Sequence, residues 1–174
     1  MSRGIFFNQI EQELGRRGLT ATPTWGSRPA AQTRKNHSLY PVRDLLVTYA
    51  TAGALIDKDP REGIRQIWIG AVHHYTSTWF GRTFRRFLRP DPVAAFQWIE
   101  RSREYIANYG HWRVELRGPE HVVLHMFDEY LWIDSAHLGG CEGLLIACGL
   151  TGEVRAELDA PFQGRLDVRW QLGN

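Results

Sequence analysis

Histidine is the residue type in this chain best suited to acid–base or metal chemistry, and two histidine pairs stand out. His73 and His74 are adjacent in a helical pattern, where neighbouring side chains point about 100° apart, so the pair cannot bind one ion together. His121 and His125 lie four positions apart in an alternating pattern, which spans about 13 Å along a strand. We therefore expect no metal site, and we expect His121 and His125 on a charged, solvent-facing sheet surface.

Two cysteines are the candidate nucleophiles or disulfide partners. Cys141 and Cys148 lie seven residues apart in a predicted helix, a spacing that suits neither a bridge nor a zinc site. The carboxylate of Glu142, next to Cys141, disfavours the reactive thiolate. We interpret both cysteines as reduced thiols, which favours a reducing compartment.

Motifs with a known catalytic mechanism are missing from the sequence. It contains no HExxH, no GxSxG and no CxxC. Residues 139–143 are rich in glycine, but the Lys-Ser or Lys-Thr of a phosphate-binding loop is missing. We therefore expect no catalytic residues and no enzymatic activity. An enzyme would need a cleft that brings His73 or His74 together with Glu142 or Asp134.

Four arginines within eight residues form the most basic stretch of the sequence: Arg82, Arg85, Arg86 and Arg89. Cations at the end of a helix complement its dipole, so a solvated helix end is one interpretation. A site for an acidic partner or a phosphate is the other. The whole chain carries a formal charge of only +2, from 21 basic and 19 acidic residues that are interspersed, which argues against a general nucleic-acid binder.

Seven tryptophans are many for a chain of 174 residues. We expect most of them in the core, where each fills a large volume. Some large side chains of the predicted central helix would also face the predicted sheet, and such a set can form an apolar ligand pocket. Its candidate lining residues are Trp68, Tyr75, Trp79 and Phe84 of the helix and Trp112 and Met126 of the sheet.

Helical spacing of apolar residues predicts that the first part of the chain, residues 1–110, is mainly helical. Asp-Pro pairs mark two of the helix starts. On the last helix, Phe96 and Ile99 face inward, and we expect Arg103 to face solvent. The predicted helices cover residues 6–17, 41–56, 59–88 and 92–110. A long loop, with room for a turn or an edge strand, covers residues 19–40.

From Trp112 onward the apolar period changes from helical to two. Residues 112–126 and 154–170 each predict a β-hairpin, and residues 135–150 predict a glycine-rich helix between them. The chain is long enough for one hydrophobic core. We therefore predict one α+β domain over residues 1–174, in which the helical part packs on a four-stranded antiparallel sheet formed by residues 111–174, with one sheet face in water.

The sequence also carries information on the compartment. No apolar run approaches the roughly 18 residues of a membrane span. The first segment contains Gln9, Glu11 and Glu13, which is not typical of a signal peptide. We expect a cytoplasmic protein without a membrane span.

Several short motifs in this order carry a family resemblance over residues 40–171. They are Tyr40-Pro41 at a helix start, the run from Tyr75 to Gly81-Arg82, Asn108-Tyr109-Gly110 before the first hairpin, and Val168-Arg169-Trp170 at the end of the second. With these motifs the chain resembles a small domain family that is expanded in myxobacteria. That family is similar in layout to heme-NO-binding and 4-vinyl-reductase-like domains.

The resemblance implies a sensory, ligand-binding or scaffolding role in a signalling setting, without an established reaction. Heme-binding relatives use an axial His and a Tyr-x-Ser-x-Arg clamp on the heme propionates. Residues 75–79 read Tyr-Thr-Ser-Thr-Trp, which shares the first half of the clamp and lacks its Arg. We therefore assign no heme ligand and expect no cofactor.

Two functions are compatible with these observations. We first expect a non-enzymatic binding or regulatory module that acts through protein–protein contacts in bacterial signalling or scaffolding, with a partner protein or a second copy in a homodimer. The alternative is a small-molecule sensor that binds an apolar ligand or a tetrapyrrole between the central helix and the sheet.

Overall fold

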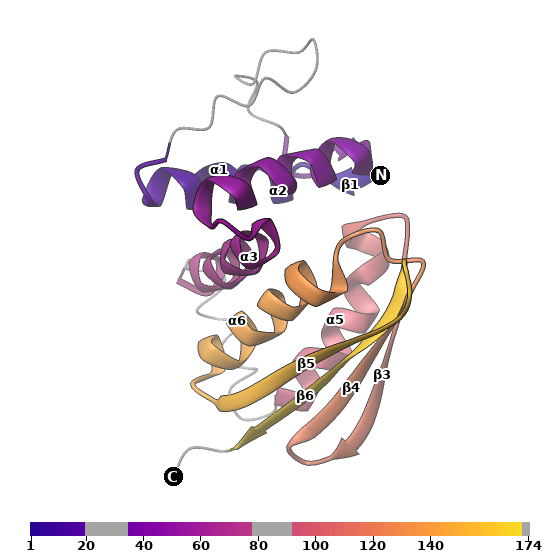
Figure 1. Ribbon diagram of the computed structural model, residues 1–174. Helices are drawn as coiled ribbons and strands as arrows, with labels where there is room; N and C mark the ends of the chain where they lie inside the picture. Colours follow the sequence, from indigo (N-terminus) through magenta and orange to yellow (C-terminus); the bar gives the residue numbers. More distant parts are fainter. Residues whose placement is uncertain (20–34, 78–91, 172–174) are drawn as a thin grey trace.

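The computed structural model describes residues 1–19, 35–77 and 92–171 of the chain. It is an α+β fold in which the helices come first, as predicted (Figure 1). The first part contains β1 (Ser2–Arg3), α1 (Ile5–Arg16), β2 (Leu39–Tyr40), α2 (Val42–Ile56), α3 (Pro60–Ser77) and α5 (Pro92–Ile106). The second part contains β3 (His111–Gly118), β4 (His121–Phe127), a π-helical turn η1 (Ile133–His137), α6 (Leu138–Cys148), β5 (Thr151–Ala160) and β6 (Gln163–Gln171).

Proline marks the helix starts that the sequence predicted. α3 begins at Pro60 and α5 begins at Pro92. Proline fits the first turn of a helix because the backbone N–H that it lacks would have no intrahelical acceptor there. The Asp59 side chain supports the start of α3 by accepting a hydrogen bond from the backbone N–H of Arg61. None of the described helices is both long and apolar enough to span a membrane.

The two hairpins form one antiparallel sheet with the strand order β3-β4-β6-β5. β4 and β6 join the hairpins, with Val122 opposite Val168 and Leu124 opposite Leu166. The side chains on this face are buried under α5 and α6. The alternate residues form an open face that carries mostly charged side chains, which confirms the predicted division into a covered face and a wet face.

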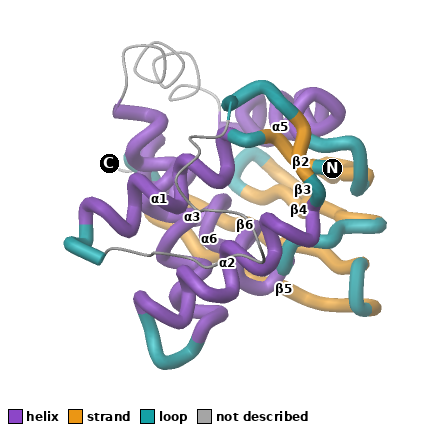
Figure 2. Tube along the Cα trace, turned by 90° about the horizontal axis from the view of Figure 1, so that it is seen from above, coloured by secondary structure: helices purple, strands orange, loops and turns teal. Residues whose placement is uncertain are grey.

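Buried apolar residues form two separate cores. One lies between the sheet and α5 and α6, and it includes Phe96, Met126 and Trp170. The other lies among α1, α2 and α3, and it includes Phe7 and Tyr49. Viewed from above, the first three helices gather on one side of the molecule and the sheet on the other (Figure 2). α3 and α6 meet where these two halves join.

Glycines allow α6 to approach α3 closely, which is the role that the sequence predicted for them. A Cβ atom on Gly139 would lie 2.3 Å from the backbone oxygen of Arg65, and one on Gly143 would lie 3.0 Å from Val72. No larger residue fits at Gly139 unless a helix moves. The glycines therefore fix the spacing of the two halves.

The small sheet formed by β1 and β2 lies partly in a region predicted as loop. Ser2 pairs with Tyr40 and Arg3 pairs with Leu39, so an edge strand exists at the end of the predicted loop over residues 19–40. Most of that loop, and the end of the central helix predicted to reach residue 88, lie outside the described residues.

Candidate functional site

Between the two cores lies a cluster of polar and aromatic side chains that are buried or half-buried. We call it the seam, and it consists of Trp68, Arg103, Trp112, Glu129 and His137. Each residue comes from a different element: α3, α5, β3, the loop after β4, and η1. Ligand sites are common at such junctions between packed units.

Local backbone features place Glu129 at the centre of the seam. The preceding residue, Asp128, has a positive φ of 52°, a conformation that Asp tolerates better than most residues. The backbone N–H of Glu129 donates a hydrogen bond of 2.9 Å to the carbonyl of Phe162 in the β5–β6 turn. The loop therefore leaves β4 sharply and directs the Glu129 side chain inward, where it is 1% exposed.

The Glu129 carboxylate binds groups from four other positions. Oε2 accepts hydrogen bonds of 2.8 Å from Arg103 Nη2 and of 2.8 Å from Trp112 Nε1. Oε1 accepts one of 3.0 Å from the backbone N–H of Leu131, and it lies 3.4 Å from His137 Nε2. Burial alone would raise the pKa of Glu129, but His137, Arg103 and the Leu131 N–H outweigh it and lower the pKa to about 2.

Aromatic rings enclose the polar groups of the seam. The His137 ring has its centroid 5.9 Å from that of Trp68 and 5.0 Å from that of Trp112. The Arg103 guanidinium lies 4.8 Å from the ring centroid of Trp112 and 4.7 Å from that of Tyr109. A cation stacked on two rings gains electrostatic attraction from both. The seam thus links the helical half to the sheet through His137.

Three buried nitrogen atoms of the seam have no hydrogen-bond partner among the described residues. They are Trp68 Nε1, Arg103 Nε and His137 Nε2. A buried donor without an acceptor costs about 1–3 kcal/mol, so native proteins usually supply one from the chain, a water or a ligand. These atoms are therefore the polar groups of the seam that still lack a hydrogen-bond partner in the described part of the chain.

The structure places the predicted pocket residues in different surroundings. Trp68 and Trp112 both contact His137. Met126 is fully buried in the core under the sheet, and Tyr75 is half-buried on α3. Trp79 and Phe84 lie outside the described residues, and so do the four candidate anion-binding arginines, Arg82, Arg85, Arg86 and Arg89.

The prediction that Arg103 faces solvent was wrong. Arg103 is 4% exposed and pairs with Glu129. A signal was present, because Phe96, Ile99 and Arg103 follow one another at helical spacing on the same stripe of α5. Glu129 and His137 were missed as site residues, since neither belongs to a motif.

The acidic residues that a catalytic cleft would need, Glu142 and Asp134, form ion pairs with arginines instead. Glu142 accepts hydrogen bonds of 2.6 and 2.8 Å from Arg65, and Asp134 pairs with Arg61. His73 is exposed. Cys141 is buried, and burial, followed by the charge of Glu142, raises the pKa of its thiol to about 12. Cys141 and Cys148 are both buried thiols outside any disulfide.

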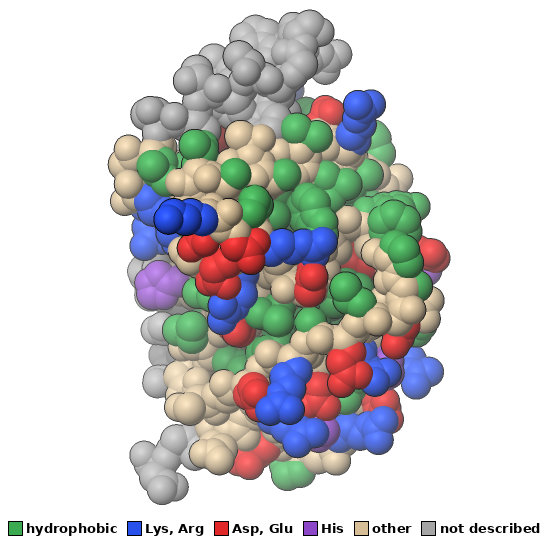
Figure 3. Space-filling model, in the orientation of Figure 1, with side chains coloured by type: hydrophobic (Ala, Val, Ile, Leu, Met, Phe, Trp, Pro, Cys, Tyr) green, Lys and Arg blue, Asp and Glu red, His purple; other side chains and the backbone are tan. Residues whose placement is uncertain are grey.

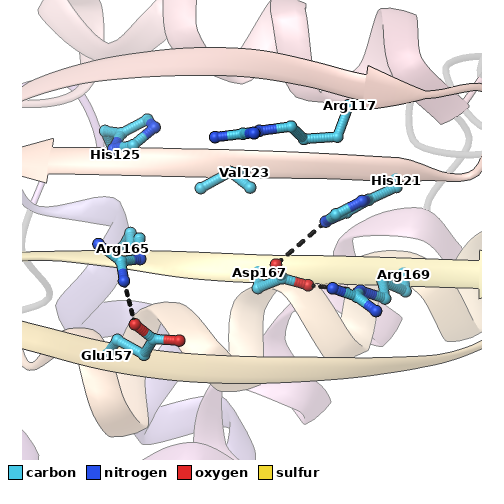
Figure 4. A pocket seen from close by; sticks show the side chains of 8 residues that line it. All are labelled: Arg117, His121, Val123, His125, Glu157, Arg165, Asp167 and Arg169. Carbon is cyan, nitrogen blue, oxygen red and sulfur yellow. Dashed lines mark hydrogen bonds and ion pairs between the residues drawn. The ribbon is translucent and has the colours of Figure 1, made fainter.

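The open face of the sheet contains a shallow pocket of about 420 Å³ (Figure 4). Val123 forms its floor, because this short side chain is surrounded by longer ones (Figure 4). His121 lies 3.0 Å from Asp167, and His125 lies 2.9 Å from Glu115. The two histidines therefore lie on the charged sheet face, as predicted, and each has its own carboxylate.

Ion pairs within the sheet account for most of the charge around this pocket. Arg165 pairs with Glu157, and Arg169 donates to Asp167 at 2.9 Å. Arg117, the remaining arginine of the lining, lies 2.9 Å from Glu115. Among the described residues, no three His, Cys, Asp or Glu side chains converge in a way that could hold a metal ion.

Comparison with solved structures shows which fold this is. The chain is similar to the Fe(II) unliganded H-NOX protein from K. algicida, with a TM-score of 0.77 and 11% identity over 98% of this chain and 97% of that chain. It is also similar to an H-NOX protein from S. oneidensis in the Fe(II)NO ligation state, with a TM-score of 0.74 and 11% identity over 98% and 99% of the two chains. The H-NOX-like layout implied by the sequence motifs is therefore confirmed.

Comparison with sequences identifies the family. No curated protein matches the chain. The sequence profile of DUF2378, described as a protein of unknown function, matches residues 1–171. This match covers nearly the whole chain, and the chain belongs to the DUF2378 family.

Proposed function

We propose that this domain is a sensor that binds a small organic molecule at the seam. The observation that carries the proposal is the buried Arg103–Glu129–His137 cluster between two separate cores. Buried charges are costly, and they often mark functional sites rather than stable cores. The H-NOX-like fold supports the proposal, because the solved structures of similar fold include an H-NOX protein in the Fe(II) unliganded state and another in the Fe(II)NO ligation state.

A histidine-ligated heme does not fit the described residues. All seven histidines lie in the described part of the chain, and only His137 is buried. Its Nε2 atom makes no hydrogen bond to the described residues, but it lies 3.4 Å from the Glu129 carboxylate, and the Trp68 and Trp112 rings contact the imidazole. His74 is half-buried on α3 and already has an interaction partner. The buried Cys141 thiol, with a pKa of about 12, is not a thiolate at neutral pH.

The side chains of the seam instead suit a flat molecule with a hydrogen-bond acceptor. Trp68 and Trp112 offer ring faces and edges, and such rings favour stacked or edge contacts with a planar partner. The unpartnered donors Trp68 Nε1 and Arg103 Nε favour a carbonyl or carboxylate oxygen. We therefore place the ligand among small aromatic or apolar compounds that carry such an oxygen.

Ligand binding at the seam would act on the contact between the two halves. α3 belongs to the helical core, whereas α5 and β3 belong to the sheet core, and the seam joins them. A ligand that prefers one arrangement of the halves shifts the population toward it by its difference in affinity. This is the physical basis of a sensor domain in a signalling protein.

Native mass spectrometry of the purified chain tests the proposal. We expect a mass excess of a few hundred daltons that disappears under denaturing conditions, and we expect it to weaken in Trp68→Phe, which keeps an apolar ring and removes the Nε1 donor. Trp98→Phe, at an exposed position of α5, is the matched control. With hemin added, we expect no Soret shift typical of histidine ligation. A stoichiometric hemin complex with that spectrum would contradict the ligand class.

A module that acts through protein contacts is the second candidate function. The observation that favours it is a group of exposed aromatic residues beside the seam, with Phe162 52% and Tyr130 41% exposed. The two functions are compatible, because a sensor needs a surface through which its state is read.

A further inference from the structure

Three aromatic rings, two of them exposed and one half-buried, gather at the end of the sheet nearest the seam. The ring centroids of Tyr109 and Tyr130 are 5.2 Å apart, and those of Tyr130 and Phe162 are 5.3 Å apart. Tyr130 and Phe162 are exposed, and Tyr109 is half-buried. We call these three residues the aromatic patch. Figure 3 shows hydrophobic side chains gathered at this end of the sheet, on the right of the view.

The composition of the aromatic patch is typical of a protein interface. Single exposed apolar residues are common, but a contiguous group from several segments is not. Tyr and Phe are enriched at the centres of interfaces because they bury much area at a small cost in side-chain entropy. The patch combines the segment after α5, the loop after β4 and the β5–β6 turn.

Carboxylates flank the aromatic patch and indicate the charge of its partner. Asp128 lies two residues before Tyr130, and Asp159 lies three residues before Phe162, and both are exposed. Arg165, which lies 3.8 Å from Asp159, also pairs with Glu157. A second copy of the chain would bring these acids against each other, whereas a partner with Lys or Arg around an apolar side chain would complement them.

The aromatic patch is joined directly to the seam. Phe162 accepts the backbone hydrogen bond of Glu129, the central residue of the seam. The ring of Tyr109 lies 4.7 Å from the Arg103 guanidinium, the other buried charge. A shift of Glu129 or Arg103 therefore moves the backbone or a ring of the patch.

We propose that the aromatic patch docks a partner protein through an apolar side chain flanked by Lys or Arg, and that the seam controls this docking. The control, but not the docking itself, rests on the proposed sensor function. Selection of peptides by phage display on the full chain tests the docking without a ligand. We expect enriched peptides with one or two aromatic or aliphatic residues next to basic ones.

Two double variants, one of the patch and one of its flanking acids, test where such a peptide binds, and a third double variant is the control. Tyr130→Ser combined with Phe162→Ser is expected to weaken the selected peptide at least about tenfold, since aromatic anchors dominate interfaces. Leu55→Ser combined with Ile146→Ser removes exposed apolar residues elsewhere and is expected to change nothing. Asp128→Asn combined with Asp159→Asn keeps the shape, since Asn also tolerates positive φ, and is expected to weaken binding severalfold and reduce its salt dependence.

Several results would overturn the inference. These are an absence of enriched peptides, enriched peptides without basic residues, or equal binding by the Tyr130–Phe162 double variant. A dimer detected by light scattering and lost in that variant would show that a second copy is the occupant instead. The peptide affinity of Glu129→Gln is measured under conditions in which that variant is folded. An unchanged affinity would refute control by the seam but not the proposed docking site.

Discussion

Replacing Glu129 by Gln tests the seam at its centre, because the change keeps the shape and removes the charge. Gln cannot pair with the Arg103 guanidinium, which is 4% exposed and would remain buried without a counter-ion. Its amide has only one acceptor oxygen, so the NH2 group must face either the donors of Arg103 and Trp112 or the backbone N–H of Leu131. We therefore expect a large loss of stability at neutral pH.

The size of this loss follows from two independent estimates. The pKa of Glu129 falls from its ordinary 4.5 to about 2, and each pKa unit corresponds to about 1.4 kcal/mol, so ionised Glu129 contributes about 3 kcal/mol at pH 7. Removing one partner of a buried ion pair typically costs about 3–5 kcal/mol. We expect Glu129→Gln to lower the free energy of unfolding by about 3–5 kcal/mol.

Urea denaturation at pH 7 measures this loss. The matched control is Glu157→Gln, because Glu157 pairs with Arg165 on the open sheet face and its side chain is 55% exposed, so the expected cost is below about 1 kcal/mol. Adding Arg103→Met to Glu129→Gln removes the unpaired cation, and we expect the double variant to lose less than the two single losses combined. A loss for Glu129→Gln no larger than that for Glu157→Gln would refute the reasoning.

Three further predictions concern stability and reactivity. The Glu129 pKa lies below its ordinary value, so the stability that ionised Glu129 contributes is complete above about pH 5 and is lost as the pH falls toward 2. Between these pH values, the free energy of unfolding of the wild type should fall more steeply with pH than that of Glu129→Gln. Gly63→Ala would place a Cβ atom 2.1 Å from the backbone oxygen of Gly53 and should cost at least about 2 kcal/mol of stability. Gly15→Ala meets no atom within 4 Å and should stabilise α1 by about 0.5–1 kcal/mol. Thermal unfolding in which both substitutions shift the Tm in the same direction would contradict this. Cys141 should react with a thiol reagent such as DTNB only after unfolding, and fast labelling of the native chain would show that the helix opens.

Local patterns predicted most of the fold. Alternation of apolar and charged residues from Trp112 onward placed the four strands, because each strand has one covered and one wet face. Asp-Pro pairs placed the starts of α3 and α5. The β1 strand carried no such signal, since Ser2 and Arg3 form a strand only by pairing with residues 39–40.

Sequence patterns alone could not identify most of the seam. Its residues come from five elements spread over 70 positions, from Trp68 to His137, and only the fold brings them together. The π-helical turn η1 adds to the difficulty, because a change of helical period over five residues leaves no pattern in composition. Trp68 and Trp112 were named as candidate pocket residues, and both contact His137. The position of Arg103 on the apolar stripe of α5 was a signal that the prediction did not use.

A titration followed by NMR tests the proposed ligand site most directly. The indole N–H resonances of Trp68 and Trp112 are recorded while planar aromatic carboxylates such as benzoate and indole-3-carboxylate are added. We predict that both resonances shift together and saturate for at least one compound, that the exposed Trp98 resonance stays in place, and that Trp68→Phe weakens the binding. If no compound moves the Trp68 and Trp112 resonances, or if Trp98 alone responds, the seam is not a ligand site and the sensor proposal is contradicted.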